Sequence, residues 1–121
     1  MWKKSILIID DEPEFAEMLK MRLEASAHNV QTAASGEEGL EKAAAEAPGL
    51  ILLDVMMPGI DGYEVLRRLR TDDATRKIPV VMLTAKGEAK SIFKAQEMGA
   101  KDYIIKPCPS DELLRLVRRY V

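Results

Sequence analysis

The stretch GLILLDVMMPG, residues 49–59, decides the fold that this sequence predicts. Four consecutive apolar residues, 50–53, lead directly into Asp54, and a Pro-Gly turn signal follows. A short apolar run that ends at a turn is typical of a strand buried on both faces, as in a parallel sheet with helices on each side. A carboxylate at the tip of such a strand needs a partner that satisfies its charge, so Asp54 marks a candidate functional site.

The rest of the chain alternates apolar runs with helical patterns. Four further runs predict strands, at 6–9, 30–34, 78–83 and 103–105. Between them, apolar residues recur at the spacing of buried helix faces. Ser35 with Glu38, and Asp61 with Glu64, resemble capping boxes, and Ser110 precedes the last helix. Such strict alternation predicts an α/β fold with right-handed crossovers, a doubly wound sandwich around five parallel strands.

Length, charge and cysteine content narrow the class of protein. The 121 residues fit one domain, 1–121. The net charge of −2 argues against a basic surface that would bind nucleic acid directly. No apolar run approaches the ~20 residues of a membrane span and no signal-peptide pattern is present, so we expect a soluble protein. The single cysteine, Cys108, cannot pair within the chain, which favours a reducing compartment and hence the cytoplasm.

Polar side chains follow the predicted strands at the point where each strand ends. Asp10 and Asp11 follow the first strand, and Asp54 follows the third. Thr84 follows the fourth strand and Lys106 the fifth. The carboxyl ends of parallel strands share one edge of the sheet, where ligands bind in open α/β folds. Carboxylates that share one partly desolvated pocket need a cation, and their oxygen atoms suit Mg²⁺, so the sequence predicts a magnesium site at this edge.

Asp54 is the candidate nucleophile of this pocket. A carboxylate can carry a phosphoryl group as an aspartyl phosphate. Lys106 would pair with one phosphoryl oxygen, and the hydroxyl of Thr84 can donate a hydrogen bond to another. The position of Thr84 could then report whether Asp54 is modified. We therefore interpret the pocket as a phosphoacceptor site.

The same residues carry a resemblance to a known family, the receiver domain of two-component response regulators, which includes chemotaxis receivers. The matching segments are LIIDDEP (7–13), LLDVMMPGIDG (52–62), VVMLTAK (80–86) and GAKDYIIKP (99–107). The resemblance covers the chain from end to end and implies a flavodoxin-like sheet of strand order 2-1-3-4-5. It also implies that Asp54 is the phosphoacceptor. Asp11, Asp54 and the Met56 backbone carbonyl would bind Mg²⁺ directly, and Asp10 would help through water.

The resemblance further implies a signalling switch that works with partners. The chain would take its phosphoryl group from a sensor histidine kinase or a histidine phosphotransfer protein, and would catalyse its own Mg²⁺-dependent phosphorylation and dephosphorylation rather than act as an enzyme on other substrates. Thr84 would move toward the phosphoryl group, and Tyr103 would turn inward into the vacated space. The fourth helix, fifth strand and fifth helix would then present a changed face to a downstream effector, or to a second copy in a phosphorylation-dependent homodimer. The bond between Lys106 and Pro107 is expected to be cis.

Two features distinguish this chain within the resemblance. Cys108 stands where an aromatic residue often follows the Lys-Pro pair, so packing at the start of the last helix is expected to differ. Met56 and Lys86 occupy the two positions whose side chains flank the phosphoryl group in receivers. Because a methionine side chain cannot orient a hydrolytic water, Met56 predicts a long-lived aspartyl phosphate.

Other interpretations of the same residues stay open. Asp10, Asp11 and Asp54 could cap helices or turns, and Lys106 could be a surface lysine. A phosphatase of the haloacid-dehalogenase type also uses a strand-end aspartate, but the Asp-x-Asp pattern of those enzymes is absent at Asp54. A module that binds flavin mononucleotide and a degenerate receiver used only for docking are further alternatives. The sequence shows no output domain, so the chain either works by docking or belongs to a longer regulator, and its last segments look closest to receivers attached to winged-helix transcription factors.

Overall fold

The computed structural model describes residues 4–85 and 89–121. Within these residues, strands and helices alternate along the chain as predicted. The strands are β1 (Ile6–Ile9), β2 (Val30–Ala33), β3 (Leu50–Asp54), β4 (Val80–Ala85) and β5 (Asp102–Lys106). The helices are α1 (Pro13–Ala25), α2 (Gly36–Glu46), α3 (Gly62–Thr71), α4 (Ala89–Glu97) and α5 (Ser110–Val117).

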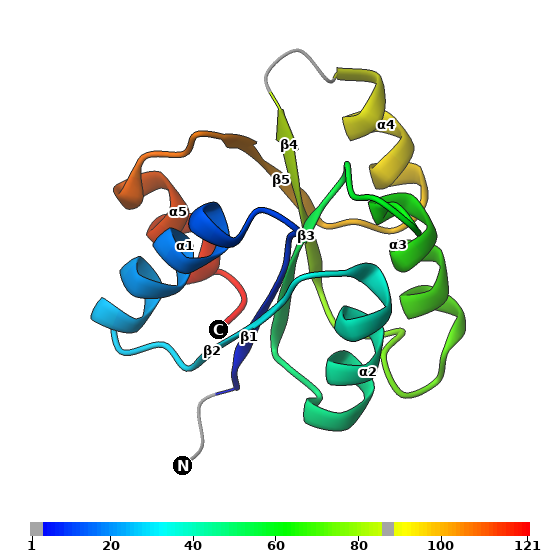
Figure 1. Ribbon diagram of the computed structural model, residues 1–121, viewed down its shortest axis with the longest axis horizontal. Coiled ribbons are helices and arrows are strands. Elements are labelled where there is room, and N and C mark those ends of the chain that lie inside the picture. Colours follow the sequence, from blue (N-terminus) through cyan, green and yellow to red (C-terminus); the bar gives the residue numbers. More distant parts are fainter. Residues whose placement is uncertain (1–3, 86–88) are drawn as a thin grey trace.

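The strands form one parallel sheet of order β2-β1-β3-β4-β5. Figure 1 shows α1 and α5 together on one face of the sheet, and α2, α3 and α4 on the other. Two helix layers around a parallel sheet of this order make up the doubly wound, flavodoxin-like fold. The predicted fold class and the strand order implied by the resemblance are both confirmed.

Each face of the sheet has its own apolar core. Ile6 and Ile8 of β1 pack in the core beneath α1 and α5, whereas Leu7 and Ile9 pack in the core beneath α2 and α3. β3 divides in the same way, and all five of its residues are buried. Alternate residues of a strand point to opposite faces, so burial on both faces explains why the apolar run at 50–53 is unbroken.

Two of the predicted helix starts have the predicted cap. The Ser35 hydroxyl accepts a hydrogen bond from the Glu38 N–H at 3.1 Å, and Asp61 Oδ1 accepts one from the Glu64 N–H at 3.0 Å. In a full capping box, the Glu38 carboxylate would accept a hydrogen bond from the Ser35 N–H. Here it accepts one from the Ala34 N–H instead, at 2.8 Å. A side-chain cap therefore marks the start of both α2 and α3.

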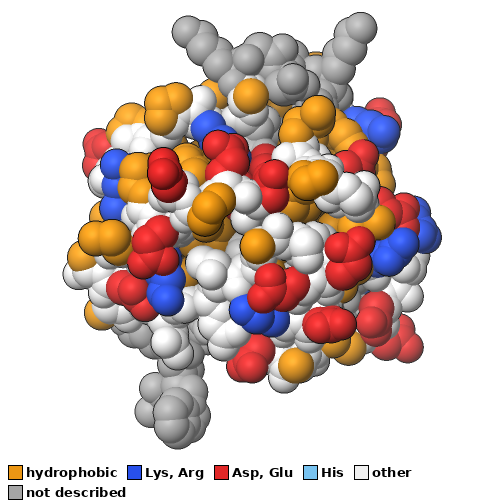
Figure 2. Space-filling model, in the orientation of Figure 1, with side chains coloured by type: hydrophobic (Ala, Val, Ile, Leu, Met, Phe, Trp, Pro, Cys, Tyr) orange, Lys and Arg blue, Asp and Glu red, His pale blue; other side chains and the backbone are white. Residues whose placement is uncertain are grey.

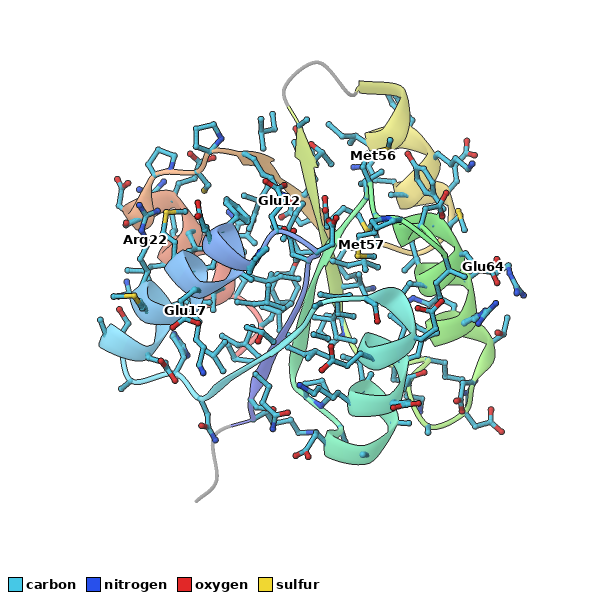
Figure 3. The ribbon with its side chains drawn as sticks, viewed as in Figure 1. Glu12, Glu17, Arg22, Met56, Met57 and Glu64 are labelled. Carbon is cyan, nitrogen blue, oxygen red and sulfur yellow. The ribbon has the colours of Figure 1, made fainter. Side chains whose placement is uncertain are left out.

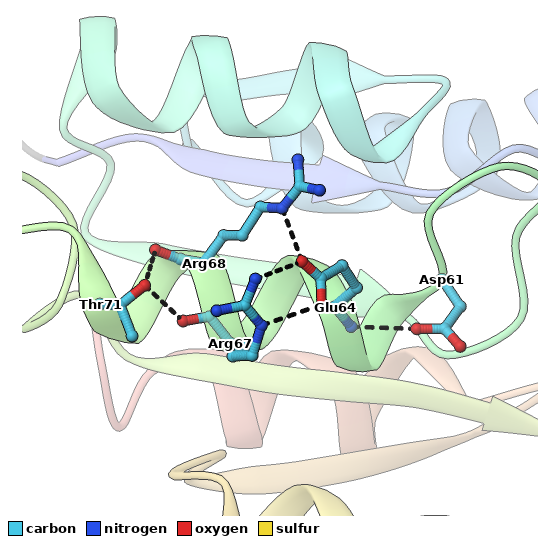
Figure 4. Close-up of polar contacts among 5 residues, drawn as sticks. All are labelled: Asp61, Glu64, Arg67, Arg68 and Thr71. Carbon is cyan, nitrogen blue, oxygen red and sulfur yellow. Dashed lines mark hydrogen bonds and ion pairs between the residues drawn. The ribbon is translucent and has the colours of Figure 1, made fainter.

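The Glu64 carboxylate turns away from the start of α3 and pairs with two arginines of the same helix (Figure 4). It lies 2.6 Å from Arg67 Nη2 and 2.7 Å from Arg68 Nε. Hydrogen bonds from Arg67 and Arg68 lower the pKa of Glu64 to about 2. These pairs are open to solvent, so they order the outer face of α3 without adding much stability.

Several element boundaries differ from the prediction by one or two residues; β2 ends at Ala33, β3 includes Asp54, and β5 runs from Asp102 to Lys106. The predicted position of Ser110, before the last helix, is wrong, because Ser110 is the first residue of α5 and Pro109 occupies the N-cap with extended backbone. The strand predicted at 78–83 begins instead at Val80, since Pro79 has no N–H to donate to a sheet. The same strand continues through Ala85. Thr84 therefore lies within the sheet and not beyond the end of the strand.

Charged and apolar groups are mixed on the surface that Figure 2 shows. Acidic, basic and hydrophobic side chains interleave over this face, and its described part carries no broad basic area. Within residues 4–85 and 89–121, no helix is both long and apolar enough to cross a membrane.

Gly62, the first residue of α3, packs directly on the backbone at the end of β3. Its N–H donates to the Val55 carbonyl at 2.9 Å, and a Cβ added at Gly62 would overlap the Asp54 carbonyl oxygen and lie 2.8 Å from the Val55 Cα. Because backbone cannot move aside as a side chain can, we expect Gly62→Ala to destabilise the fold by about 2 kcal/mol. Denaturant unfolding measures this, with Glu41→Ala on the exposed face of α2 as the control. Equal stability of the two variants would contradict the prediction.

Candidate functional site

The strand register brings the predicted site residues to one edge of the sheet. β1 and β3 pair through Ile9 and Leu53, so the residues that follow, Asp10 and Asp54, lie side by side. Lys106 is the last residue of β5. All strands run in the same direction, so these side chains share the carboxyl edge, as predicted.

The Lys106 ammonium joins three carboxylates at this edge. Its Nζ lies 2.8 Å from Asp10 Oδ2, 3.3 Å from Asp54 Oδ1 and 3.1 Å from Glu12 Oε1. The side chains of Asp10 and Asp54 are 0% and 7% exposed, whereas that of Glu12 is 63% exposed. Buried carboxylates require a paired cation, and among the described residues Lys106 provides it.

Burial and neighbouring charge decide which groups of the site are ionised. Burial, and then the negative charge of Asp10, raise the pKa of Asp54 to about 7, although Lys106 opposes this. Burial works to lower the pKa of Lys106, but hydrogen bonding and charge from the surrounding carboxylates raise it above its ordinary value. Asp54 thus titrates near neutral pH beside a permanent cation, a combination that is common at functional sites.

Asp10 has a structural role beside its ion pair. Its Oδ1 accepts a hydrogen bond from the Glu12 N–H at 2.9 Å and so closes the turn that leads into α1. Its Oδ2 faces Lys106. The alternative interpretation of Asp10 as a turn residue is therefore correct for one of its two oxygens, and the other belongs to the site.

The Thr84 hydroxyl is buried without a protein partner. Thr84 is 1% exposed, and among the described residues its Oγ1 finds no hydrogen-bond partner. An unpaired buried hydroxyl costs roughly 1–3 kcal/mol, so it needs an explanation. Thr84 lies on β4, next to the strand that ends in Asp54. A group with acceptor oxygens attached at Asp54 would supply the missing partner.

The carboxylates of Asp10, Glu12 and Asp54 could together hold a metal ion. One oxygen of each lies within 4.8 Å of the others. Glu12, which Figure 3 labels near the start of α1, was not predicted as a site residue. The signal for it was its place as the third acidic residue in a row after β1. Asp11 is half-buried and belongs to no such group of three in the described part of the chain, so its place as a direct ligand stays a prediction.

The structure describes two of the remaining predicted residues. Met56 follows β3 by two residues, and its side chain is 68% exposed. The Tyr103 side chain is 37% exposed on β5, so its inward turn stays a prediction. Lys86 lies outside the described residues.

The loop after β5 has the expected peptide geometry. The bond between Lys106 and Pro107 is cis, as the resemblance implied. Cys108 is 5% exposed and packs in the core beneath α1 and α5. Its carbonyl accepts a hydrogen bond from Arg22 Nη1 at 3.1 Å, which ties the loop to α1.

Comparisons with known proteins agree with this geometry. A family model described as the response regulator receiver domain matches residues 6–118. The chain is 42% identical over 113 residues to the DNA-binding dual master transcriptional regulator RpaA of Synechocystis sp., covering 93% of this chain and 47% of that protein. It is 46% identical over 104 residues to the alkaline phosphatase synthesis transcriptional regulatory protein PhoP of Bacillus subtilis, covering 86% and 42%. The crystallised chemotaxis protein CheY4 of Vibrio cholerae is similar in structure, with a TM-score of 0.92 and 28% identity over 99% of this chain and 100% of that one.

The fold, the site and these matches together define the class of protein. The chain belongs to the response regulator receiver domain family, and it is a receiver domain of two-component signalling. It spans about half the length of the curated relatives that it matches. The family assignment favours a receiver over the phosphatase and flavin-binding alternatives.

Proposed function

We propose that this domain accepts a phosphoryl group on Asp54 from a phosphohistidine of a sensor histidine kinase or a histidine phosphotransfer protein. The observation that carries the proposal is a buried carboxylate with a pKa of about 7 that lies 3.3 Å from the Lys106 ammonium. The unpartnered hydroxyl of Thr84 on the neighbouring strand supports it. A phosphoryl group carries several acceptor oxygens, which an ammonium and a hydroxyl can bind together.

In the proposed transfer, a lone pair on an ionised Asp54 oxygen forms the bond to phosphorus. The bond between phosphorus and the donor imidazole nitrogen breaks, and its electron pair stays on that nitrogen. Lys106 shifts from Asp54 to a phosphoryl oxygen, where it offsets the negative charge. The Thr84 hydroxyl donates a hydrogen bond to another phosphoryl oxygen. In dephosphorylation, a water oxygen forms a bond to phosphorus while the bond between phosphorus and the Asp54 oxygen breaks. The electron pair of that bond returns to the Asp54 carboxylate, and the proton of the water passes to solvent.

The acidic groups at this edge suit Mg²⁺, since carboxylate oxygens within 4.8 Å of one another are ligands of the type that hard divalent ions prefer. In this proposal Asp11, Asp54 and the Met56 carbonyl hold the ion and Asp10 acts through water, with Glu12 as a further candidate ligand. When bound, Mg²⁺ supplies positive charge that offsets the charge of the phosphoryl oxygens. Magnesium affinities of the variants Asp11→Asn and Glu12→Gln identify which of the two side chains is a ligand.

The proposed output of the switch is the face formed by α4, β5 and α5. Phe93, Tyr103 and Ile105 are exposed apolar side chains on α4 and β5. Their exposure supports a contact surface here, because a downstream effector or a second copy of the domain would cover them. In the proposed switch, Thr84 moves toward the phosphoryl group and Tyr103 turns inward. The curated relatives named above are transcriptional regulators, so we propose a cytoplasmic role in which any DNA contact lies outside this domain.

Direct phosphorylation tests the proposal. Intact-protein mass spectrometry after incubation with Mg²⁺ and a small phosphodonor is expected to show the gain of one phosphoryl group. Chelation of the metal is expected to prevent the gain, and peptide mapping is expected to locate the group on Asp54. An unmodified protein under these conditions, or a phosphoryl group on another residue, would overturn the proposal.

Magnesium affinity is expected to fall as the pH drops through 7. Protons compete with the metal for the Asp54 oxygens, and the pKa of this carboxyl is raised to about 7. Below that pH, the apparent affinity should weaken by up to about tenfold per pH unit. Isothermal titration calorimetry at pH 8, 7 and 6 measures the effect. An affinity that stays constant across this range would show that Asp54 is not a ligand.

The aspartyl phosphate is expected to be long-lived for a receiver. The exposed Met56 side chain has no hydrogen-bond donor and only a weakly accepting thioether sulfur, so it is poorly suited to orient a hydrolytic water. Met56→Asn should therefore shorten the half-life of the phosphorylated protein several-fold, whereas Met56→Leu, which adds no polar atom, should not. Loss of the phosphoryl mass with time measures both. A wild-type half-life of only seconds without any phosphatase would contradict the expectation.

A further inference from the structure

The Lys106 ammonium has an aromatic neighbour that the proposed transfer does not yet use. The Phe15 ring on the first turn of α1 faces it, with 4.5 Å between Nζ and the ring centroid. An ammonium at this distance over the face of a ring is attracted by the ring's quadrupole. Phe15 is half-buried and packs against the core beneath α1 and α5, so the ring has a fixed support.

The ring completes the surroundings of the ammonium. Three carboxylate oxygens, from Asp10, Glu12 and Asp54, match the three N–H donors of Lys106. Of the two contacts that come from the start of α1, the pair with Glu12 is open to solvent and screened. The Phe15 contact is the better shielded of the two, so it should constrain the flexible lysine side chain more.

The geometry matters because Lys106 has to change partners. When a phosphoryl group is attached to Asp54, the ammonium must leave the Asp54 oxygen and bind a phosphoryl oxygen. The contact with Phe15 does not involve Asp54, so it can persist while that exchange takes place. Without the contact with the Phe15 ring, the flexible four-carbon side chain of Lys106 would have more freedom to leave the site.

We infer that Phe15 is a positioning residue, whose ring holds the Lys106 ammonium within reach of the phosphoryl group on Asp54. The inference rests on the proposed function for its catalytic consequence, but the contact itself is independent of it. Its expected effect is modest, because a partly shielded contact between an ammonium and an aromatic ring corresponds to about a threefold to tenfold change in rate.

The variants Phe15→Leu and Phe15→Tyr test the inference. Leucine retains an apolar side chain without a ring face, whereas tyrosine retains the ring. In NMR spectra without Mg²⁺ or phosphodonor, the ring current should displace the Lys106 Hε resonances of wild type and Phe15→Tyr but not those of Phe15→Leu. Thermal unfolding of both variants identifies any general damage to the fold.

Phosphorylation of the same variants gives the functional result. At saturating Mg²⁺, Phe15→Leu should lower the maximal rate of phosphorylation about threefold to tenfold, with little change in the half-saturating phosphodonor concentration. Phe15→Tyr, which retains the ring, should have a higher maximal rate than Phe15→Leu. Equal rates for wild type and a folded Phe15→Leu would overturn the inference, as would unchanged Lys106 resonances. If the wild type takes no phosphoryl group, the proposed function is wrong, and the NMR result alone decides whether Phe15 positions Lys106.

Discussion

Asp54→Asn is expected to abolish phosphorylation by the small phosphodonor and, at the same time, to make the protein more stable at pH 8. The amide has no ionised oxygen to attack phosphorus, so no phosphoryl mass should be gained. The gain in stability follows because the substitution removes one of the negative charges that are crowded around Asp10 and Lys106. Opposite changes in function and stability would show that the variant is inactive for a chemical reason and not because it unfolds.

The pKa of Asp54 sets the sign of the stability change. Folding raises this pKa from 3.8 to about 7, so the folded state holds the proton more tightly than the unfolded state. The stability that this provides is complete below about pH 4 and is lost as the pH rises through 7. This difference of about three in pKa corresponds to a change in the free energy of unfolding of at most about 4 kcal/mol. We expect about 2 kcal/mol at pH 8, since the substitution also removes a partner of Lys106.

Denaturant unfolding of wild type and Asp54→Asn at pH 5 and pH 8 measures this difference. The stability advantage of the variant should be small at pH 5 and grow toward pH 8. Saturating Mg²⁺ should narrow the gap by stabilising the wild type more. A variant that is less stable than wild type at pH 8, or one that still gains a phosphoryl group, would contradict the prediction.

Lys106→Met is expected to destabilise the protein by about 3 kcal/mol at pH 8 and to slow phosphorylation about a hundredfold. Methionine fills a similar volume but leaves the buried carboxylates of Asp10 and Asp54 without their cation. The loss of stability should shrink at pH 5, because Asp54, with its raised pKa, then takes up a proton. Magnesium should restore part of the lost stability, since its positive charge replaces that of the Lys106 ammonium.

Lys42→Met provides the matched control for this prediction. Lys42 pairs with Glu38 at 3.1 Å and donates to the Thr32 carbonyl, but its side chain and that of Glu38 are 36% and 43% exposed, far more than those of Asp10 and Asp54. Loss of such a pair should change the free energy of unfolding by only about 0–1 kcal/mol, with little dependence on Mg²⁺. If Lys106→Met proved no more destabilising than Lys42→Met, the three carboxylates would not depend on Lys106, and the electrostatic account of the site would fail.

Most of the fold could be predicted because its signals are local. The unbroken apolar run at 50–53, which ends at a turn signal, is typical of a strand covered on both faces. The caps at Ser35 and Asp61 begin helices where the sequence places them. The boundaries that were missed depend on neighbouring strands and turns. Thr84 lies inside β4 because it pairs with β5, a contact between segments that the sequence pattern does not encode locally.

The sequence by itself determined the order of the elements, the strand-end positions of Asp10, Asp54 and Lys106, and membership of the receiver family. Only the tertiary structure decided which groups contact one another across the sheet edge. Glu12 and Phe15 reach Lys106 from the start of α1, over a sequence separation of more than ninety residues. Periodicity and propensity report the neighbours of a residue along its own helix or strand. Distances between side chains of different strands and helices, and the pKa shifts that these distances and burial cause, arise only when the layers pack.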